Sequence, residues 1–234
     1  MQFKDCFSWS EYDWEREIRK DDARLSAYIT ELPKYIDLPG EDSILMRTIK
    51  RRLGAENQED WGPVPYEESA DEQDMSPFPG SENWRAADGG PVYHNCTVLA
   101  RDFILGAASC PDEKIRPRVM RILTFYGQLM ARSADLIDMS LEVQRSQMEY
   151  DECEIPDNLR IALVKRLLSF QNKLSQELKL LEEESPELKA HAEAHLEATG
   201  MMHDYLIDLL YSIRGRVRSM PGENSFNDDD DIPF

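Results

Sequence analysis

Three of the chain's four histidines are close together in the sequence, at positions 191, 195 and 203. His191 and His195 have the i, i+4 spacing that places two side chains on one face of a helix, and Glu187 lies one turn before them. Imidazole nitrogens and a carboxylate are ligands that divalent transition metals accept. The spacing therefore permits a surface metal site without requiring one, because histidines on a half-exposed polar face are common in proteins that bind no metal.

The sequence around these histidines contains no HExxH motif and no Glu-x-x-His pair of the kind that di-iron bundles supply twice. A second set of possible ligands is His94, Cys96 and Cys110, which have neither paired spacing nor an evident fourth partner. The four cysteines are far apart, a pattern typical of a reducing cytoplasm in which thiols are buried or idle. A helical-bundle metal-binding protein that uses His191 and His195, or His94 and Cys96, is an alternative on these grounds.

Motifs that would indicate catalysis or cofactor binding are not found in the sequence. It has no Gly-rich phosphate loop and no GxSxG nucleophile elbow. Acidic residues number 46, so a pair of carboxylates carries no specific signal for acid–base chemistry. We therefore expect a protein that is not an enzyme and that has no cofactor.

The last nine residues combine a run of charge with an apolar tip. They read Phe226-Asn-Asp-Asp-Asp-Asp-Ile-Pro-Phe234, and they follow Pro221 and Gly222, which end the last helical pattern. Ile232, Pro233 and Phe234 therefore have no core of their own chain to reach. An exposed apolar tip behind a run of aspartates is typical of a peptide that enters a partner's pocket.

Residues 226–234 resemble the acidic tip of bacterial single-stranded-DNA-binding proteins, which recruits replication, recombination and repair enzymes. The resemblance implies that Phe234 fills an apolar pocket on such an enzyme and that its α-carboxylate meets an Arg or Lys there. Pro233 and Ile232 would pack beside it, and the aspartates would steer the peptide toward a basic rim. The residues expected to contact the partner are Phe226, Asp228, Asp229, Asp230, Asp231, Ile232, Pro233 and Phe234.

Two interpretations of this tip stay open. The chain could recruit DNA-maintenance enzymes, or it could act as a decoy that competes with the host's own single-strand-binding protein. A different class of function, a structural oligomer whose acidic tail only keeps it soluble, is a further alternative.

Hydrophobic periodicity predicts helices in the first quarter of the chain and little order after it. Residues 10–32 form an amphipathic pattern with Ser10 as the N-cap, and Pro33 is expected to close this helix. A second short pattern ends at Gly54. The N-terminal helical segment is therefore predicted at 1–54. Residues 55–91 are rich in Pro, Gly and acids and predict a flexible linker.

The remainder predicts an antiparallel bundle of four helices over residues 96–218, within a domain at 92–219. The expected helices cover 97–108, a span from Asp112 and Pro117 to about Tyr150, a span from Pro156 to 184, and one that begins at Ser185-Pro186. No segment shows the period-2 alternation of an OB barrel. The sequence thus predicts an all-α protein with an acidic, disordered tail at 220–234.

The formal net charge of −19 is unevenly distributed. Residues 55–90 and 220–234 contain 15 acidic side chains and one basic side chain, so the expected folded parts are nearly balanced. A protein that binds the phosphate backbone concentrates positive charge, so direct nucleic-acid binding is not expected. Basic residues do cluster at Arg116, Arg118 and Arg121, where a helix start disfavours cations, so this cluster needs another partner. A partner carboxylate, the chain's own acidic linker or its own acidic tail would each serve.

The N-terminus has no apolar stretch of the kind found in secretory signals, and no segment is long enough to span a bilayer. We therefore expect a cytoplasmic protein that does not contact membranes. The expected partners are DNA-maintenance proteins with a pocket for a single-strand-binding-protein tail. The helical bundle could also form a homo-oligomer.

Overall fold

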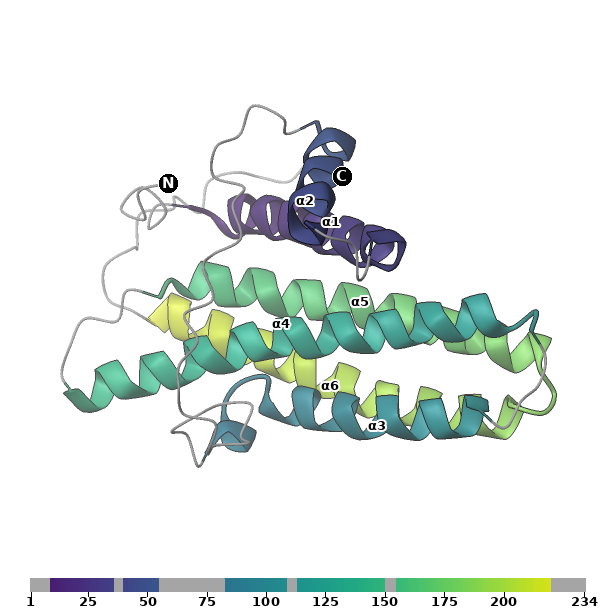
Figure 1. Ribbon diagram of the computed structural model, residues 1–234. Helices are drawn as coiled ribbons and strands as arrows, with labels where there is room; N and C mark the ends of the chain where they lie inside the picture. The colour runs from purple at the N-terminus through teal and green to yellow at the C-terminus, as the bar shows by residue number, and fades with distance from the viewer. Residues whose placement is uncertain (1–8, 36–39, 55–82, 109–112, 150–154, 220–234) are drawn as a thin grey trace, which may run out of the picture. The chain divides into compact units, whose positions relative to one another are not determined.

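The computed structural model describes residues 9–35, 40–54, 83–108, 113–149 and 155–219. Every element in these ranges is helical, which confirms the predicted all-α class (Figure 1). None of the described helices is both long and apolar enough to cross a membrane. The described residues divide into two compact units, one within residues 9–54 and the other within residues 83–219.

The smaller unit pairs helix α1, Glu11–Tyr35, with helix α2, Glu41–Arg52. As predicted, Ser10 precedes α1, and its hydroxyl donates a 2.7 Å hydrogen bond to the carboxylate of Asp13. Helix α1 runs past Pro33 to Tyr35, so the expected closure was two residues early. Apolar side chains of both helices form the core of this unit, with Ala27, Leu45 and Ile49 buried.

The larger unit is a four-helix bundle. Its helices are α3 (Gly90–Ala108), α4 (Arg116–Glu149), α5 (Asp157–Glu184) and α6 (Lys189–Ser219). Each packs against two others, with α3 beside α4 and α6, and α5 beside α4 and α6 (Figure 1). The interior is apolar and continuous, and its largest fully buried side chains include Phe103, Tyr126 and Phe170. Short connections between consecutive long helices give the antiparallel arrangement that the sequence predicted.

Helix α3 begins at Gly90, seven residues before the predicted start at Thr97. A single 3-10 turn, η2 at Trp84–Ala86, precedes it. The Trp84 and Tyr93 rings meet edge to face with centroids 5.6 Å apart, and the Gly89 N–H donates to the Tyr205 hydroxyl at 3.3 Å. The Gly- and Pro-rich composition suggested a linker here, but tertiary contacts attach residues 83–91 to the bundle.

The remaining helix boundaries follow the sequence closely, with one correction. Ser185 was predicted to cap the last helix, but it instead ends α5, since its N–H donates to the Leu181 carbonyl at 2.9 Å. A turn at residues 186–188 follows, and α6 begins at Lys189. Leu188 occupies the position before it and accepts the N–H of Ala192 at 2.8 Å. The correction matters because it removes Glu187 from the helix that carries the histidines.

Candidate functional site

The structure brings three possible metal ligands together where α3 lies beside α6. Asp102 comes from α3, and His191 and His195 come from α6. Their ligand atoms all lie within 4.8 Å of one another. The Asp102 Oδ2 atom is 3.2 Å from His195 Nε2 and 3.8 Å from His191 Nδ1. We call these three residues the histidine cluster; it is the one group of this kind among the described residues.

Local packing holds the two imidazoles against α3. The His191 ring stacks on Phe103 with centroids 5.7 Å apart, and the His195 ring meets Phe103 edge to face at 5.3 Å. Gly106 makes the approach of His191 possible, because a Cβ atom at that position would lie 2.4 Å from His191 Nε2. A glycine within a helix costs about 1 kcal/mol relative to alanine. Here it gives the imidazole room beside the α3 backbone.

A buried tyrosine orients the deeper imidazole. The Tyr126 hydroxyl on α4 lies 2.8 Å from His195 Nδ1, and both side chains are almost completely buried. Burial raises the pKa of Tyr126, so its hydroxyl stays protonated at neutral pH. Burial also lowers the pKa of His195, and His191 lowers it further, against the opposing effect of Asp102. His195 is therefore held as the neutral imidazole, the form that binds metals.

The histidine cluster is closed on the bundle side and open to solvent on the other. The His195 side chain is 2% exposed and that of His191 22%, whereas that of Asp102 is 62% exposed. An ion bound here would have three protein ligands and an accessible position for water or a further ligand, the arrangement typical of non-structural zinc sites.

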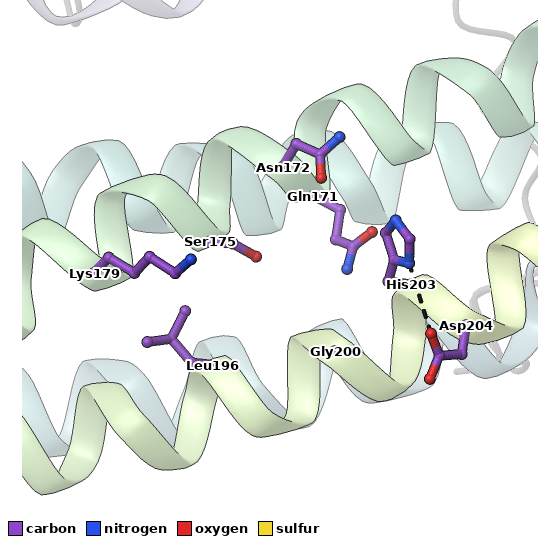
Figure 2. A pocket seen from close by; sticks show the side chains of 8 residues that line it. All are labelled: Gln171, Asn172, Ser175, Lys179, Leu196, Gly200, His203 and Asp204. Atoms are coloured by element: carbon purple, nitrogen blue, oxygen red, sulfur yellow. Dashed lines mark ion pairs between the residues drawn. The ribbon is translucent and has the colours of Figure 1, made fainter.

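The carboxylate of the histidine cluster is Asp102 and not Glu187, which the sequence placed one turn before His191. The third histidine of α6, His203, also lies apart. It lines a pocket between α5 and α6, and its Nδ1 is 3.7 Å from Asp204 Oδ1 (Figure 2). The residues that line this pocket are Gln171, Asn172, Ser175, Lys179, Leu196, Gly200, His203 and Asp204.

The alternative ligand set at His94 and Cys96 does not assemble. Residues two apart on a helix point to different faces, and here His94 is exposed while Cys96 is fully buried. The Cys96 thiol lies 3.8 Å from the Met202 sulfur, and burial raises its pKa to about 12. Cys110 lies outside the described residues. His94 and Cys96 thus lie on different faces of α3, and the Cys96 thiol is a core group.

Two of the three basic residues at the start of α4, Arg118 and Arg121, pair with carboxylates of α5. Arg118 contacts Glu177 at 2.6 Å and Glu184 at 2.7 Å, both on α5. Arg121 contacts Glu177 at 3.1 Å. These ion pairs tie α4 to α5 and account for the cluster without a nucleic-acid partner.

The sequence analysis did not anticipate a second polar cluster inside the bundle. Arg160 on α5 is 5% exposed, and its terminal nitrogens bind Asp88 and Asp157. Arg216 on α6 lies 3.7 Å from Asp88. We call Asp88, Asp157 and Arg160 the arginine cluster. A buried arginine between two carboxylates is a structural arrangement, since Arg160 and the nearby Arg216 together balance the two acids within the chain.

The partner-contacting residues predicted at 226–234 lie outside the described residues. No protein-family model matches the chain, and no curated protein or solved structure is similar to it. Functional inference therefore rests on the residues themselves.

Proposed function

We propose that this protein is a cytoplasmic, non-enzymatic interaction protein that docks residues 226–234 on enzymes of DNA replication, recombination or repair. The observation that carries the proposal is the sequence Asp-Asp-Asp-Asp-Ile-Pro-Phe at 228–234, which resembles the tip of single-stranded-DNA-binding proteins. In that mode Phe234 is the anchor in an apolar pocket, with Ile232 and Pro233 packed beside it.

The described body supports a role as a carrier of this peptide rather than as a DNA-binding domain. Among the described residues there is no strand, so no OB barrel accompanies the tip in that part of the chain. The basic residues Arg118 and Arg121 are paired with carboxylates of α5. Helix α6 ends at Ser219, so only fifteen residues connect the bundle to the end of the peptide at Phe234. The bundle then brings a second partner, or another copy of itself, to the docked enzyme.

Competition with a labelled tail peptide of a single-strand-binding protein tests the proposal. The peptide is bound to a purified recombination helicase that recognises such tails, and the intact chain is titrated against it while anisotropy is recorded. Intact protein should displace the peptide. Phe234→Ala should weaken competition by roughly thirtyfold, because truncation of an aromatic anchor costs about 2 kcal/mol or more.

Matched variants distinguish the effect of the Phe234 anchor from the effect of the aspartate charges. Replacement of Asp228 to Asp231 by Asn should reduce competition less than Phe234→Ala does and should flatten its salt dependence, because rim charges act mainly on the association rate. Glu223→Gln is the control for charge elsewhere in the same segment and should compete like the intact chain. The proposal is contradicted if the intact protein and Phe234→Ala compete equally well. It is also contradicted if neither competes across several tail-binding enzymes, and the tail would then serve only to keep the protein soluble.

A loading assay distinguishes recruitment from competition. Enzyme loading is measured on DNA coated with the single-strand-binding protein, with and without the chain. Increased loading indicates recruitment, whereas reduced loading that depends on Phe234 indicates a decoy.

A further inference from the structure

We propose that Asp102, His191 and His195 bind one divalent transition metal ion, of which Zn²⁺ is the representative, and that this ion joins α3 to α6. The proposal is independent of the tail and of its partners. It depends on a donor set, a geometry and a supporting shell that only the folded chain assembles, since Asp102 is 89 residues from His191 in the sequence.

The donor set and its spacing fit such an ion. Two imidazole nitrogens and one carboxylate oxygen are the ligands that Zn²⁺ and its neighbours accept. Bonds of about 2.1 Å in tetrahedral geometry separate the ligand atoms by about 3.4 Å. The Asp102 Oδ2 atom lies 3.2 Å from His195 Nε2 and 3.8 Å from His191 Nδ1. All three ligand atoms lie within 4.8 Å of one another, so binding one ion requires them to draw together, which the 62% exposed Asp102 carboxylate has the freedom to do.

The charge around Asp102 also fits a cation. Within the described part of the chain, the ion-pair contacts of its carboxylate are with the two imidazoles. The carboxylate is thus not neutralised by a lysine or arginine of the kind that satisfies the other interhelical acids, such as Glu177 beside Arg118. An ion of charge +2 complements this arrangement.

The surroundings of His195 have the features that a metal-bound histidine shows. If His195 binds through Nε2, its Nδ1 carries the proton and donates to the Tyr126 hydroxyl 2.8 Å away, which fixes the tautomer and the ring orientation. Phe103 forms an apolar wall against both rings. Such a wall excludes water from the inner side of the site and strengthens the interaction of the ion with its ligands.

A metal-free hydrogen-bond chain accounts for only part of the observed geometry. Tyr126, His195 and Asp102 form a continuous chain, with contacts of 2.8 Å and 3.2 Å on the two nitrogens of His195. His191 is left over. Its Nδ1 is 3.8 Å from Asp102 Oδ2, beyond hydrogen-bond distance, so it takes no part in that chain. A bound ion gives His191 a role that the chain of hydrogen bonds does not.

Calorimetric titration of the full chain with Zn²⁺ tests the proposal, after tag removal, chelation and gel filtration. Wild-type protein should bind one Zn²⁺ ion that is lost in Asp102→Ala and in His191→Ala. Loss of a direct ligand should weaken that ion's binding by at least about a hundredfold, since even second-shell substitutions cost 10–100-fold. Both side chains are partly exposed, so circular dichroism should show an intact bundle in each variant.

His203→Ala and His94→Ala are matched controls, because both imidazoles are solvent-accessible and lie outside the histidine cluster. Each should bind Zn²⁺ as the wild type does, and any zinc held by cysteines or by the acidic segments is common to all variants. The proposal is overturned if folded Asp102→Ala and His191→Ala bind Zn²⁺ with the stoichiometry and affinity of the wild type. It is also overturned if the wild type binds no stoichiometric Zn²⁺.

Discussion

The two polar clusters inside the bundle differ in how their charges are balanced. In the arginine cluster a buried guanidinium lies between Asp88 and Asp157, so the cation is part of the chain. In the histidine cluster a carboxylate faces two imidazoles, and no lysine or arginine of the described residues forms an ion pair with it. The first arrangement pairs its charges within the chain. The second is the one for which we propose a bound cation.

The comparison predicts the largest energetic effect at the arginine cluster. Arg160→Met should lower the free energy of unfolding by about 3 kcal/mol, the lower end for breaking a buried pair, because Asp88 and Asp157 are partly exposed. Urea unfolding followed by circular dichroism measures this effect. Arg145→Ala, which removes an exposed i, i+3 pair with Glu142, should cost less than about 1 kcal/mol. An equally small cost for Arg160→Met would show that the cluster does not support the fold.

Zn²⁺ binding should remain unchanged in Arg160→Met whenever the variant is folded. We thus expect the histidine cluster to determine Zn²⁺ affinity and the arginine cluster to determine stability. A large loss of Zn²⁺ affinity in a folded Arg160→Met variant would mean that the clusters are coupled through the bundle.

The next prediction concerns Zn²⁺ affinity after substitution of Gly106. Gly106→Ala should reduce Zn²⁺ affinity by about a hundredfold, because the new Cβ atom would lie 2.4 Å from His191 Nε2 and must displace that ring. The control is Gly127→Ala on α4, where no atom lies within 4 Å of an added Cβ. That variant should leave Zn²⁺ binding unchanged and raise stability by about 0.5–1 kcal/mol. Equal Zn²⁺ affinity in the two variants would contradict the proposed position of His191.

A smaller effect on Zn²⁺ affinity is expected at Tyr126, which contacts His195 but is not itself a proposed ligand. Tyr126→Phe removes the hydroxyl that faces His195 Nδ1 and should weaken Zn²⁺ binding by about tenfold. It should also destabilise the metal-free bundle by about 1–2 kcal/mol, since a buried imidazole nitrogen loses its partner. Paired measurements of Zn²⁺ affinity and urea stability check both. Loss of stability with no loss of affinity would identify Tyr126 as a purely structural residue.

The helices were predictable from the sequence because each has a clear apolar period and its own end signals. Pro156 and Gly54 marked boundaries that the structure confirms, since α5 begins at Asp157 and α2 ends at Arg52. The start of α3 was missed because glycine and proline usually interrupt a helix, and Gly89, Gly90 and Pro91 stand there. In the structure Gly90 instead lets the start of α3 lie against the backbone of Trp84, since a Cβ at this position would clash with the Trp84 carbonyl oxygen.

The candidate site was only half predictable. The i, i+4 spacing identified His191 and His195 as neighbours, and the structure places their ring centroids 4.5 Å apart. Their burial was not foreseen, and the expectation of solvated histidines on a polar face was wrong for His195, which is 1% exposed. Asp102 was one acid among 46, and nothing local singled it out. Only the pairing of α3 with α6 selects it.

The central claim is that an ion binds between α3 and α6 at the histidine cluster. X-ray diffraction from crystals of the full chain grown with Zn²⁺, recorded on both sides of the zinc absorption edge, tests it most directly. We expect an anomalous peak about 2.0–2.2 Å from Asp102 Oδ2, His191 Nδ1 and His195 Nε2, and no zinc peak at the arginine cluster. Zinc peaks confined to other residues, with the cluster at its metal-free distances, would contradict the account.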